Sequence, residues 1–334
     1  MGAVVDSTGG VETMLMFRKM LCVAVVFAGV ASRAQTTEAK VEFDVASVRQ
    51  NKAGGAQHSN VPLDSGNVYS AIDPSDGRTA AGGFFVATNY PLWRYIVFAY
   101  KLSGTQEMVL RLGYFEGLDA KAPKWVAGGF EGNADKFNIE ARAPENTSID
   151  QMRLMMQSLL AERFHLVVHH ETHEAPAFAL VLARPGAAGP HLQPHPATDV
   201  CPELTTAADK AAAATSHSAV GELPPVCGVV AHVPSEKNPR TSYGGRGVPL
   251  SLLATSLPTM TGLAIISRPV VDQTGFAGLY DFTLQWEVTN ETETGDNTAA
   301  FRSALKGQLG LELKPTRAPI DILVIDHVEH PSEN

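Results

Sequence analysis

Residues 159–182 (LLAERFHLVVHHETHEAPAFALVL) and residues 305–325 (LKGQLGLELKPTRAPIDILVI) carry the same pattern of apolar residues around an Ala-Pro pair. The apolar positions that correspond are Phe164, Leu166 and Val168 in the first stretch and Leu309, Leu311 and Leu313 in the second. The pairs Ala175-Pro176 and Ala318-Pro319 correspond as well. This repetition predicts an internal duplication, in which two copies of one supersecondary unit pack together.

The correspondence continues upstream of these stretches. Phe137-Asn138-Ile139 matches Tyr280-Asp281-Phe282 at the same offset as the Ala-Pro pairs. We predict a first copy over residues 41–185 and a second over residues 246–334. The Pro-, Ala- and His-rich residues 186–245 between them are predicted to be a surface insertion or linker.

Each copy is predicted to contain a helix, a strand, a second helix and two closing strands. In the first copy we expect an initial strand at Glu42–Val48 and helices that start at Pro91 and after Ser148, which forms a capping-box pattern with Gln151. The closing strands are expected to form hairpins, with a turn at Glu174-Ala175-Pro176 in the first copy. These units predict an α+β fold of small mixed or antiparallel sheets, covered by helices and related by a pseudo-twofold axis.

Residues 1–34 carry the features of a secretory signal peptide. The basic segment Met16–Met20 precedes an apolar run that is too short for a stable membrane span, and Ser32-Arg33-Ala34 offers small residues for cleavage. The initiator is then expected at Met14 or Met16. We predict a periplasmic or extracellular protein with no membrane span after signal removal.

Charge and cysteine content narrow the classes of partner and cofactor. The formal net charge of −9 and the lack of a basic block disfavour nucleic acid as a partner. Cys201 and Cys227 are predicted to form a disulfide, as an even pair does in an oxidising compartment. The alternative is a metal site with His217 and His232, although their spacing is irregular. We predict no cofactor.

The helix that begins at Pro91 carries several aromatic residues, among them Trp93 and Tyr95. Such a set predicts either an apolar groove for a ligand or the packing of the helix against a sheet. Both interpretations stay open at this point, and Trp93 and Tyr95 are candidate ligand-binding residues.

Two titratable residues are further candidates for a binding or catalytic site. Asp272 lies in Val271-Asp272-Gln273-Thr274-Gly275, which resembles the Asp-Thr-Gly of aspartic proteases, but the inserted Gln273 favours a turn at the end of a strand. His327 follows Asp326. Because neighbouring residues of a strand face opposite sides of a sheet, these two are not expected to act on one substrate.

The stretch from His169 to His173 (HHETH) is the other titratable cluster. On a strand, His169, Glu171 and His173 would share one face, with His170 on the other. A zinc site needs ligands that converge within about 2 Å of the metal, and the helical His-Glu-x-x-His arrangement is absent. A solvated strand end is therefore favoured over a metal site.

The sequence resembles a family of secreted proteins of unknown function that occur in many copies in soil acidobacteria. The segments that carry this resemblance are Phe43–Val48, Gln151–Met155, Leu159–Phe164, His170–Thr172, Arg268–Gly275, Gly278–Phe282 and the closing Val324–Asn334. Related domains occur on antibiotic-sensor-type membrane peptidases, which implies a binding or sensing role. In relatives, the positions of His170 and His173 are commonly Arg and Lys, which weakens a metal interpretation.

We therefore predict a secreted, non-enzymatic module that binds or senses an envelope protein, a peptide or a cell-wall ligand. Sheet edges or the cleft between the copies are the expected binding surfaces, since edge strands pair readily with added strands. The alternative is an extracytoplasmic hydrolase that uses Asp272, His327 or the cluster from His169 to His173. A purely structural envelope protein is a third possibility.

Overall fold

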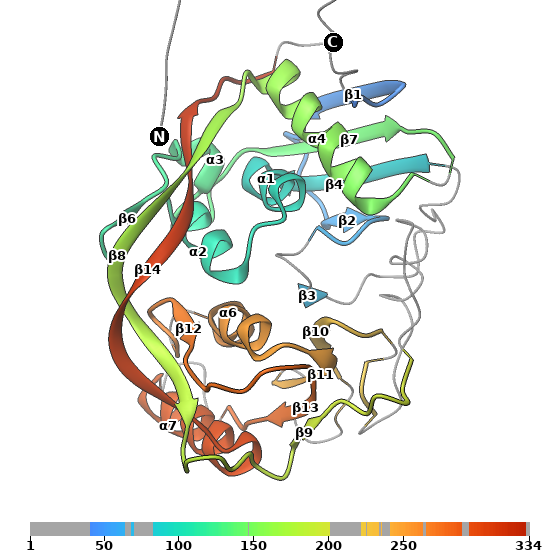
Figure 1. Ribbon diagram of the computed structural model, residues 1–334. Coiled ribbons are helices and arrows are strands. Elements are labelled where there is room, and N and C mark those ends of the chain that lie inside the picture. Colours follow the sequence, from blue (N-terminus) through green and yellow to red (C-terminus); the bar gives the residue numbers. More distant parts are fainter. Residues whose placement is uncertain are drawn as a thin grey trace, which may run out of the picture. The chain divides into compact units, whose positions relative to one another are not determined.

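Two long strands, β8 (Val167–Leu182) and β14 (Leu311–His327), pair with each other in antiparallel fashion along almost their whole length (Figure 1). Ala175 lies directly opposite Ala318, so the two Ala-Pro pairs of the repeated stretches meet in the middle of this ladder. The computed structural model describes residues 41–63, 68–69, 83–145, 147–200, 222–224, 226–233, 235, 241–262, 265–288 and 294–331. The predicted signal peptide lies outside these residues.

The hairpins predicted at the end of each copy are wrong. The chain continues as one strand through Pro176, which lies opposite Arg317, and through Pro319, which lies opposite Glu174. Proline lacks the N–H that a central strand needs, but it is tolerated on a strand with an open edge. In a two-stranded ribbon every strand has such an edge, so the Ala-Pro pairs do not need to form turns.

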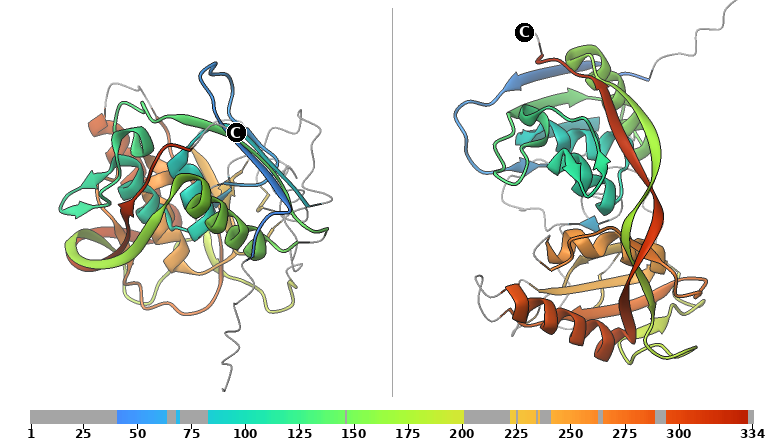
Figure 2. Two further views of the ribbon diagram at one scale, coloured as in Figure 1. Left: turned by 90° about the horizontal axis from the view of Figure 1, so that it is seen from above. Right: turned by 90° about the vertical axis from the view of Figure 1, so that its left-hand side faces the viewer.

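The first sheet has the strand order β1-β7-β4-β2, and all its neighbours are antiparallel (Figures 1 and 2). Its strands are β1 (Val45–Gln50), β2 (His58–Ser59), β4 (Phe84–Pro91) and β7 (Lys136–Arg142). Helices α1 (Leu92–Tyr100) and α4 (Ile149–Phe164) cover one face and bury a core that includes Phe85, Phe137 and Ile139. The predicted capping box of α4 is confirmed, because Ser148 and Gln151 exchange hydrogen bonds of 3.1 Å.

Between α1 and β7 the chain forms four further elements, of which the first packs beside β14. They are α2 (Gly104–Leu112), β5 (Tyr114–Phe115), β6 (Leu118–Asp119) and α3 (Lys124–Ala127). The N–H of Ile325 donates to the carbonyl of Ala120 over 2.9 Å, which ties the end of β14 to the segment after β6.

The second sheet has the order β3-β10-β11-β13-β9, with only the β3–β10 pair parallel. Its strands are β3 (Val68–Tyr69), β9 (Leu192–Pro194), β10 (Val229–His232), β11 (Ser242–Val248) and β13 (Tyr280–Gln285). The neighbouring helices are α6 (Leu250–Thr261), α7 (Thr294–Ala304) and the π-helical turn η3 (Leu305–Leu309). Strand β12 (Val270–Asp272) pairs in parallel with β8.

The segment 186–245, predicted as a surface insertion or linker, forms strands in its described part. It supplies β9, β10 and half of β11 to the second sheet. These strands are short, and β11 contains three glycines, which weaken its strand pattern. Gly245 is required by packing, because a Cβ there would lie 2.4 Å from the ring of Phe282.

Both halves of the fold present their elements in the same order. The first has β4, α1, β7, α4 and β8, and the second has β11, α6, β13, α7 and β14. In each half the first of these strands bulges just before its helix, at Ala87/Tyr90 and at Gly245/Val248. The α+β class is confirmed, whereas the duplication stays a prediction.

The two bulges are held by equivalent hydrogen bonds. Asn89 and Gly247 both have left-handed backbones, with φ of 61° and 60°. The N–H of Asn89 donates to Asn138 Oδ1 over 2.8 Å, and the N–H of Gly247 donates to Asp281 Oδ1 over 2.7 Å. Asn138 and Asp281 are the central residues of the matched triplets in the sequence.

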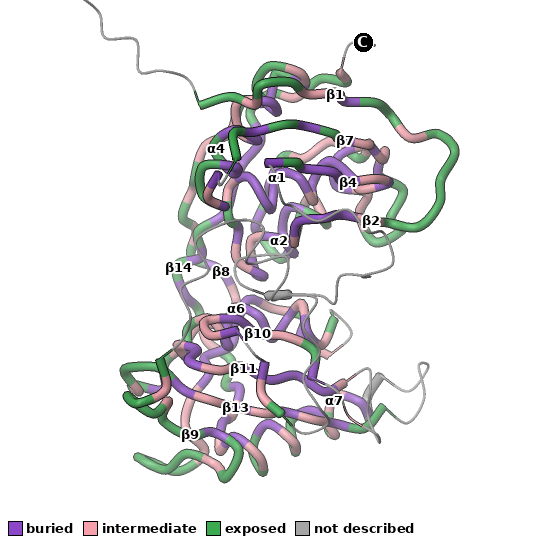
Figure 3. The backbone as a smooth tube through the Cα atoms, turned by 90° about the vertical axis from the view of Figure 1, so that its right-hand side faces the viewer, coloured by how far each residue is buried: buried purple, intermediate pink, exposed green. Residues whose placement is uncertain are grey.

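The long strand pair contributes to two hydrophobic cores (Figure 3). Ile322 of β14 is buried among residues of the first sheet and its helices, and Leu180 of β8 is buried among those of the second. Each half thus completes the core of the other, and residues Lys40–Asn334 form one compact unit. None of the described helices combines the length and the apolar character needed to cross a membrane.

Candidate functional site

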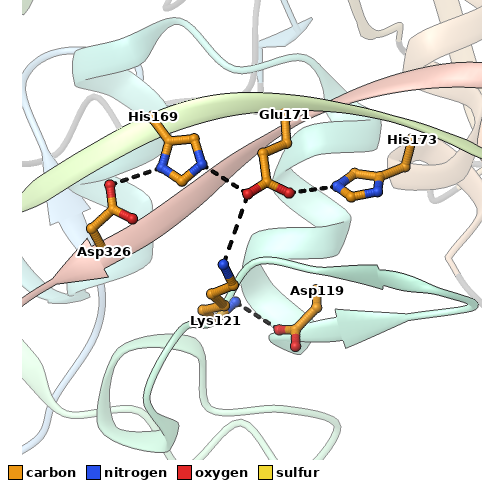
Figure 4. Close-up of polar contacts among 6 residues, drawn as sticks. All are labelled: Asp119, Lys121, His169, Glu171, His173 and Asp326. Atoms are coloured by element: carbon orange, nitrogen blue, oxygen red, sulfur yellow. Dashed lines mark hydrogen bonds and ion pairs between the residues drawn. The ribbon is translucent and has the colours of Figure 1, made fainter.

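The histidines of β8 form a hydrogen-bonded network with acidic residues, here called the imidazole–carboxylate cluster: His169, Glu171, His173, Asp326 and Lys121 (Figure 4). Glu171 lies at its centre. Its Oε1 is 2.8 Å from His169 Nε2, and its Oε2 is 2.7 Å from His173 Nε2. As the sequence predicts, these three side chains share one face of the strand.

The other two members come from distant parts of the chain. Asp326 lies where β14 bulges between Ile325 and His327, and its Oδ2 is 2.8 Å from His169 Nδ1. Lys121 follows β6, and its Nζ lies 3.8 Å from Glu171 Oε1. The cluster therefore links β8, the end of β14 and the segment after β6.

The charges of the cluster shift its ionisation. Hydrogen bonds to Asp326 and then to Glu171 raise the pKa of His169 above its ordinary value of 6.5. Hydrogen bonds from His169 and then His173 lower the pKa of Glu171 below its ordinary value of 4.5. The cluster consequently favours a protonated His169 beside an ionised Glu171.

The polar side-chain atoms of the imidazole–carboxylate cluster bond to one another, which argues against catalysis. Both ring nitrogens of His169 and both carboxylate oxygens of Glu171 already have partners within the cluster. No hydroxyl or thiol is bonded to any of its imidazoles among the described residues, so it lacks an activated nucleophile. His169 and His173 also contact different oxygens of Glu171 and do not converge as metal ligands would.

We expect the cluster to make stability depend on pH in a defined window. The raised pKa of His169 gives a stabilising contribution that is present below 6.5 and lost as pH rises through the folded-state value. The lowered pKa of Glu171 gives one that is present above 4.5 and lost as pH falls through the folded-state value. Both contributions are therefore complete between about pH 4.5 and 6.5.

The measurement is urea unfolding of the natural protein and of Glu171→Gln across this pH range. The difference in unfolding free energy between them should be largest within the window and shrink on either side. His170→Gln, whose imidazole pairs with Asp321 outside the cluster, is the matched control. A difference that does not vary with pH would contradict this assignment.

A second group, His195, Asp199 and Asp281, places its possible ligand atoms within 4.8 Å of one another. The guanidinium of Arg246 already bonds both carboxylate oxygens of Asp199, with Nε 2.8 Å from Oδ2. Asp281 accepts the N–H of Gly247 and contacts His195 Nδ1. An arginine thus provides the cation, and this group fastens the segment after β9 to β11 and β13.

The predicted ligand-binding residues of α1 are part of the core. Tyr95 is completely buried, and its hydroxyl lies 2.9 Å from the carbonyl of Phe137, to which it donates. Trp93 is also buried, and the guanidinium of Arg94 lies 4.4 Å from its ring centre. Packing against the sheet, the alternative interpretation of these aromatics, is the one that the structure supports.

Asp272 and His327 belong to separate polar networks. Asp272 Oδ1 accepts hydrogen bonds from the N–H and the hydroxyl of Thr274, at 2.9 and 2.8 Å, which is the strand-ending turn favoured by the sequence. His327 Nε2 lies 2.8 Å from Glu329 on the exposed end of β14. The structure does not bring these two residues together with each other or with Trp93 and Tyr95.

Of the two cysteines predicted to pair, Cys227 lies within the described residues. Cys227 is disulfide-bonded. Cys201 lies outside the described residues, as does His217, so the pairing of Cys201 with Cys227 stays a prediction. The ring of His232 packs against Tyr243 with ring centres 4.0 Å apart and planes tilted by 36°, and burial lowers the pKa of His232.

The sequence did not single out the outer face of the first sheet, the face opposite α1 and α4. A groove of about 660 Å³ lies there, lined among the described residues by Val45, Ser47, Asn60, Phe84, Val86, Glu140, Ala141 and Arg142. Alternation along β7 (KFNIEAR) does place Glu140 and Arg142 on one face. The alternation along β7 does not predict that no described helix covers this face.

Cross-strand pairing arranges the lining of the groove in rows. Arg142 of β7 lies directly between Val45 of β1 and Phe84 of β4, and its guanidinium is 4.9 Å from the centre of the Phe84 ring. In the next row Glu140 lies between Ser47 and Val86. The groove therefore combines an apolar surface with one basic and one acidic side chain.

These features define an α+β protein built from two helix-covered sheets that share one long strand pair, with a groove on a sheet face that no described helix covers. The family model for a protein of unknown function (DUF3738) matches residues 94–328, and the chain belongs to this family. No curated protein and no solved structure matches the chain.

Proposed function

We propose that this protein is an exported, non-enzymatic binding module that binds a protein partner through the outer face of its first sheet. Export is inferred from the signal-peptide features of residues 1–34, and the resemblance to secreted acidobacterial proteins supports it. A sensing role, as on related sensor peptidases, would use the same surface.

The groove is the observation that carries this proposal. Val45 is 69% exposed and Phe84 is 44% exposed, although each lies on a strand whose opposite face is packed in the core. A sheet normally covers an apolar face with another layer, and an uncovered apolar patch with a polar rim is typical of an interaction site. A partner that covers this face would bury the apolar surface that the protein alone leaves exposed.

The edge of β8 is less suited to binding. Apart from its contact with β12 at Phe178–Leu180, only β14 pairs with it among the described residues. The open part carries three histidines, two glutamates and Pro176, and charged residues and proline are the usual means of blocking strand addition. We therefore place the binding surface on the groove and on the neighbouring edge strand β1.

The hydrolase alternative has weaker support. Its candidates, Asp272, His327 and the imidazole–carboxylate cluster, belong to three separate networks and do not line the groove. A hydrolase needs a nucleophile or activated water within reach of a general base and a site that holds the substrate.

The test is photo-crosslinking of the full-length protein in its native envelope or secreted fraction. A photoreactive amino acid at Val45, inside the groove, should give a discrete protein adduct, and Arg142→Glu in the same chain should weaken it. The control carries the probe at Leu154, which is 48% exposed on α4. Equal labelling from both positions, or none from Val45, would contradict the proposed binding surface.

A further inference from the structure

The geometry points to a second copy of this chain as the partner that covers the groove, so that the protein forms a twofold dimer through the outer faces of two first sheets. This inference rests on the proposed function and identifies the partner class of the same site. A twofold interface uses the same patch on both subunits, so the patch must be complementary to itself.

The charges of the groove meet this requirement. Glu140 and Arg142 lie two residues apart on β7 and project from the same face, about 6.6–7 Å apart along the strand. A twofold axis between them would turn the second β7 antiparallel to the first. Glu140 of each copy would then face Arg142 of the other, which gives two ion pairs per dimer.

Both side chains are available for such pairs. Neither Glu140 nor Arg142 makes a hydrogen bond or ion pair within the described residues, and both are exposed. Stacking on Phe84 holds the guanidinium of Arg142 over the sheet. Two sheets pack face to face about 10 Å apart, a distance that a glutamate and an arginine span together.

The apolar residues beside these charges supply the area that would be buried. Val45 and Phe84 flank Arg142 in one row and are exposed, whereas Val86, which flanks Glu140 in the next row, is already buried. The two charges of the groove cancel, so the contact avoids much of the repulsion between chains of net charge −9. At physiological ionic strength the remaining repulsion is screened over about 8 Å.

The experiment is sedimentation velocity of the full-length protein and of the charge-reversed variants Glu140→Arg and Arg142→Glu. A homodimer of either variant would contain two contacts between like charges. We therefore expect the dimerisation affinity of each variant to fall roughly a hundredfold. An equimolar mixture of the two should form a heterodimer, because the Glu140→Arg chain then presents two cations to the two carboxylates of the Arg142→Glu chain, with one ion pair at each contact. The double variant should dimerise like the natural protein.

The mixture also separates a broken interface from a misfolded chain, since two misfolded variants would not restore each other. A natural protein that stays monomeric up to its highest soluble concentration would overturn the dimer, and so would single variants that dimerise like it. If it is monomeric but the probe at Val45 captures a different protein, the dimer fails while the proposed function stands. A monomer without a groove-specific adduct overturns both.

Discussion

Replacing Ile322 by alanine is expected to lower the unfolding free energy of the whole chain by about 2–5 kcal/mol. Ile322 is completely buried, and although it belongs to β14, it packs in the core of the first sheet. The substitution removes several buried carbon atoms and leaves a cavity between β14 and the helices of the first half.

The measurement is urea unfolding followed by tryptophan fluorescence and by circular dichroism. Since β8 and β14 contribute to both cores, the two signals should shift together in one transition. Lys314→Ala, on an exposed position of the same strand, is the control and should change stability by less than about 0.5 kcal/mol. Separate transitions for the two signals would contradict the conclusion that each half completes the hydrophobic core of the other.

The second large effect is expected at the bulge of β11. Asp281 is only 15% exposed and accepts from the N–H of Gly247 while it contacts His195 Nδ1 at 2.8 Å. Asp281→Ala would leave both partners without an acceptor, at a cost of about 3 kcal/mol. Asp281→Asn should cost clearly less, because an amide oxygen holds the equivalent bulge in the first half, where Asn138 accepts from Asn89.

Thermal unfolding of the Asp281 variants, with Asn138→Ala as the matched change in the first half, checks this prediction. The alanine variants of the two halves should both be strongly destabilised. If Asp281→Asn were as unstable as Asp281→Ala, the charge of Asp281, and not the hydrogen bond to the bulge, would be the main contribution.

Local signals in the sequence predicted individual elements well. The capping-box pattern of Ser148 and Gln151 predicted the helix that α4 forms, and the matched triplet at Phe137 lies in β7. These elements depend on interactions between residues only a few positions apart. The α+β class followed from their order.

The predictions that failed depend on contacts between distant parts of the chain. Whether Pro176 lies in a turn or within a strand is decided by β14, which begins more than a hundred residues later. The strands of residues 186–245 were missed because glycine, as at Gly245, carries no strand pattern of its own, yet the ring of Phe282 leaves room for nothing larger.

In the candidate sites, too, local patterns predicted some features, whereas others depend on contacts between distant parts of the chain. A strand period of two placed His169, Glu171 and His173 on one face, as observed. Asp326 contacts His169 only because β14 pairs with β8, and no local sequence pattern predicts this contact. The groove was missed because its residues come from separate strands, and because an uncovered face becomes visible only once the helices are placed.

The pairing of the two repeated stretches is the central claim, and a double substitution tests it most directly. Ala175→Cys and Ala318→Cys, combined in one chain, place two thiols directly opposite each other across the ladder. Mild oxidation should then give an intramolecular disulfide between positions 175 and 318, found by mass mapping of the unreduced protein. Free thiols at both positions in the folded protein, as expected if Ala175 lay in a hairpin turn, would contradict this fold.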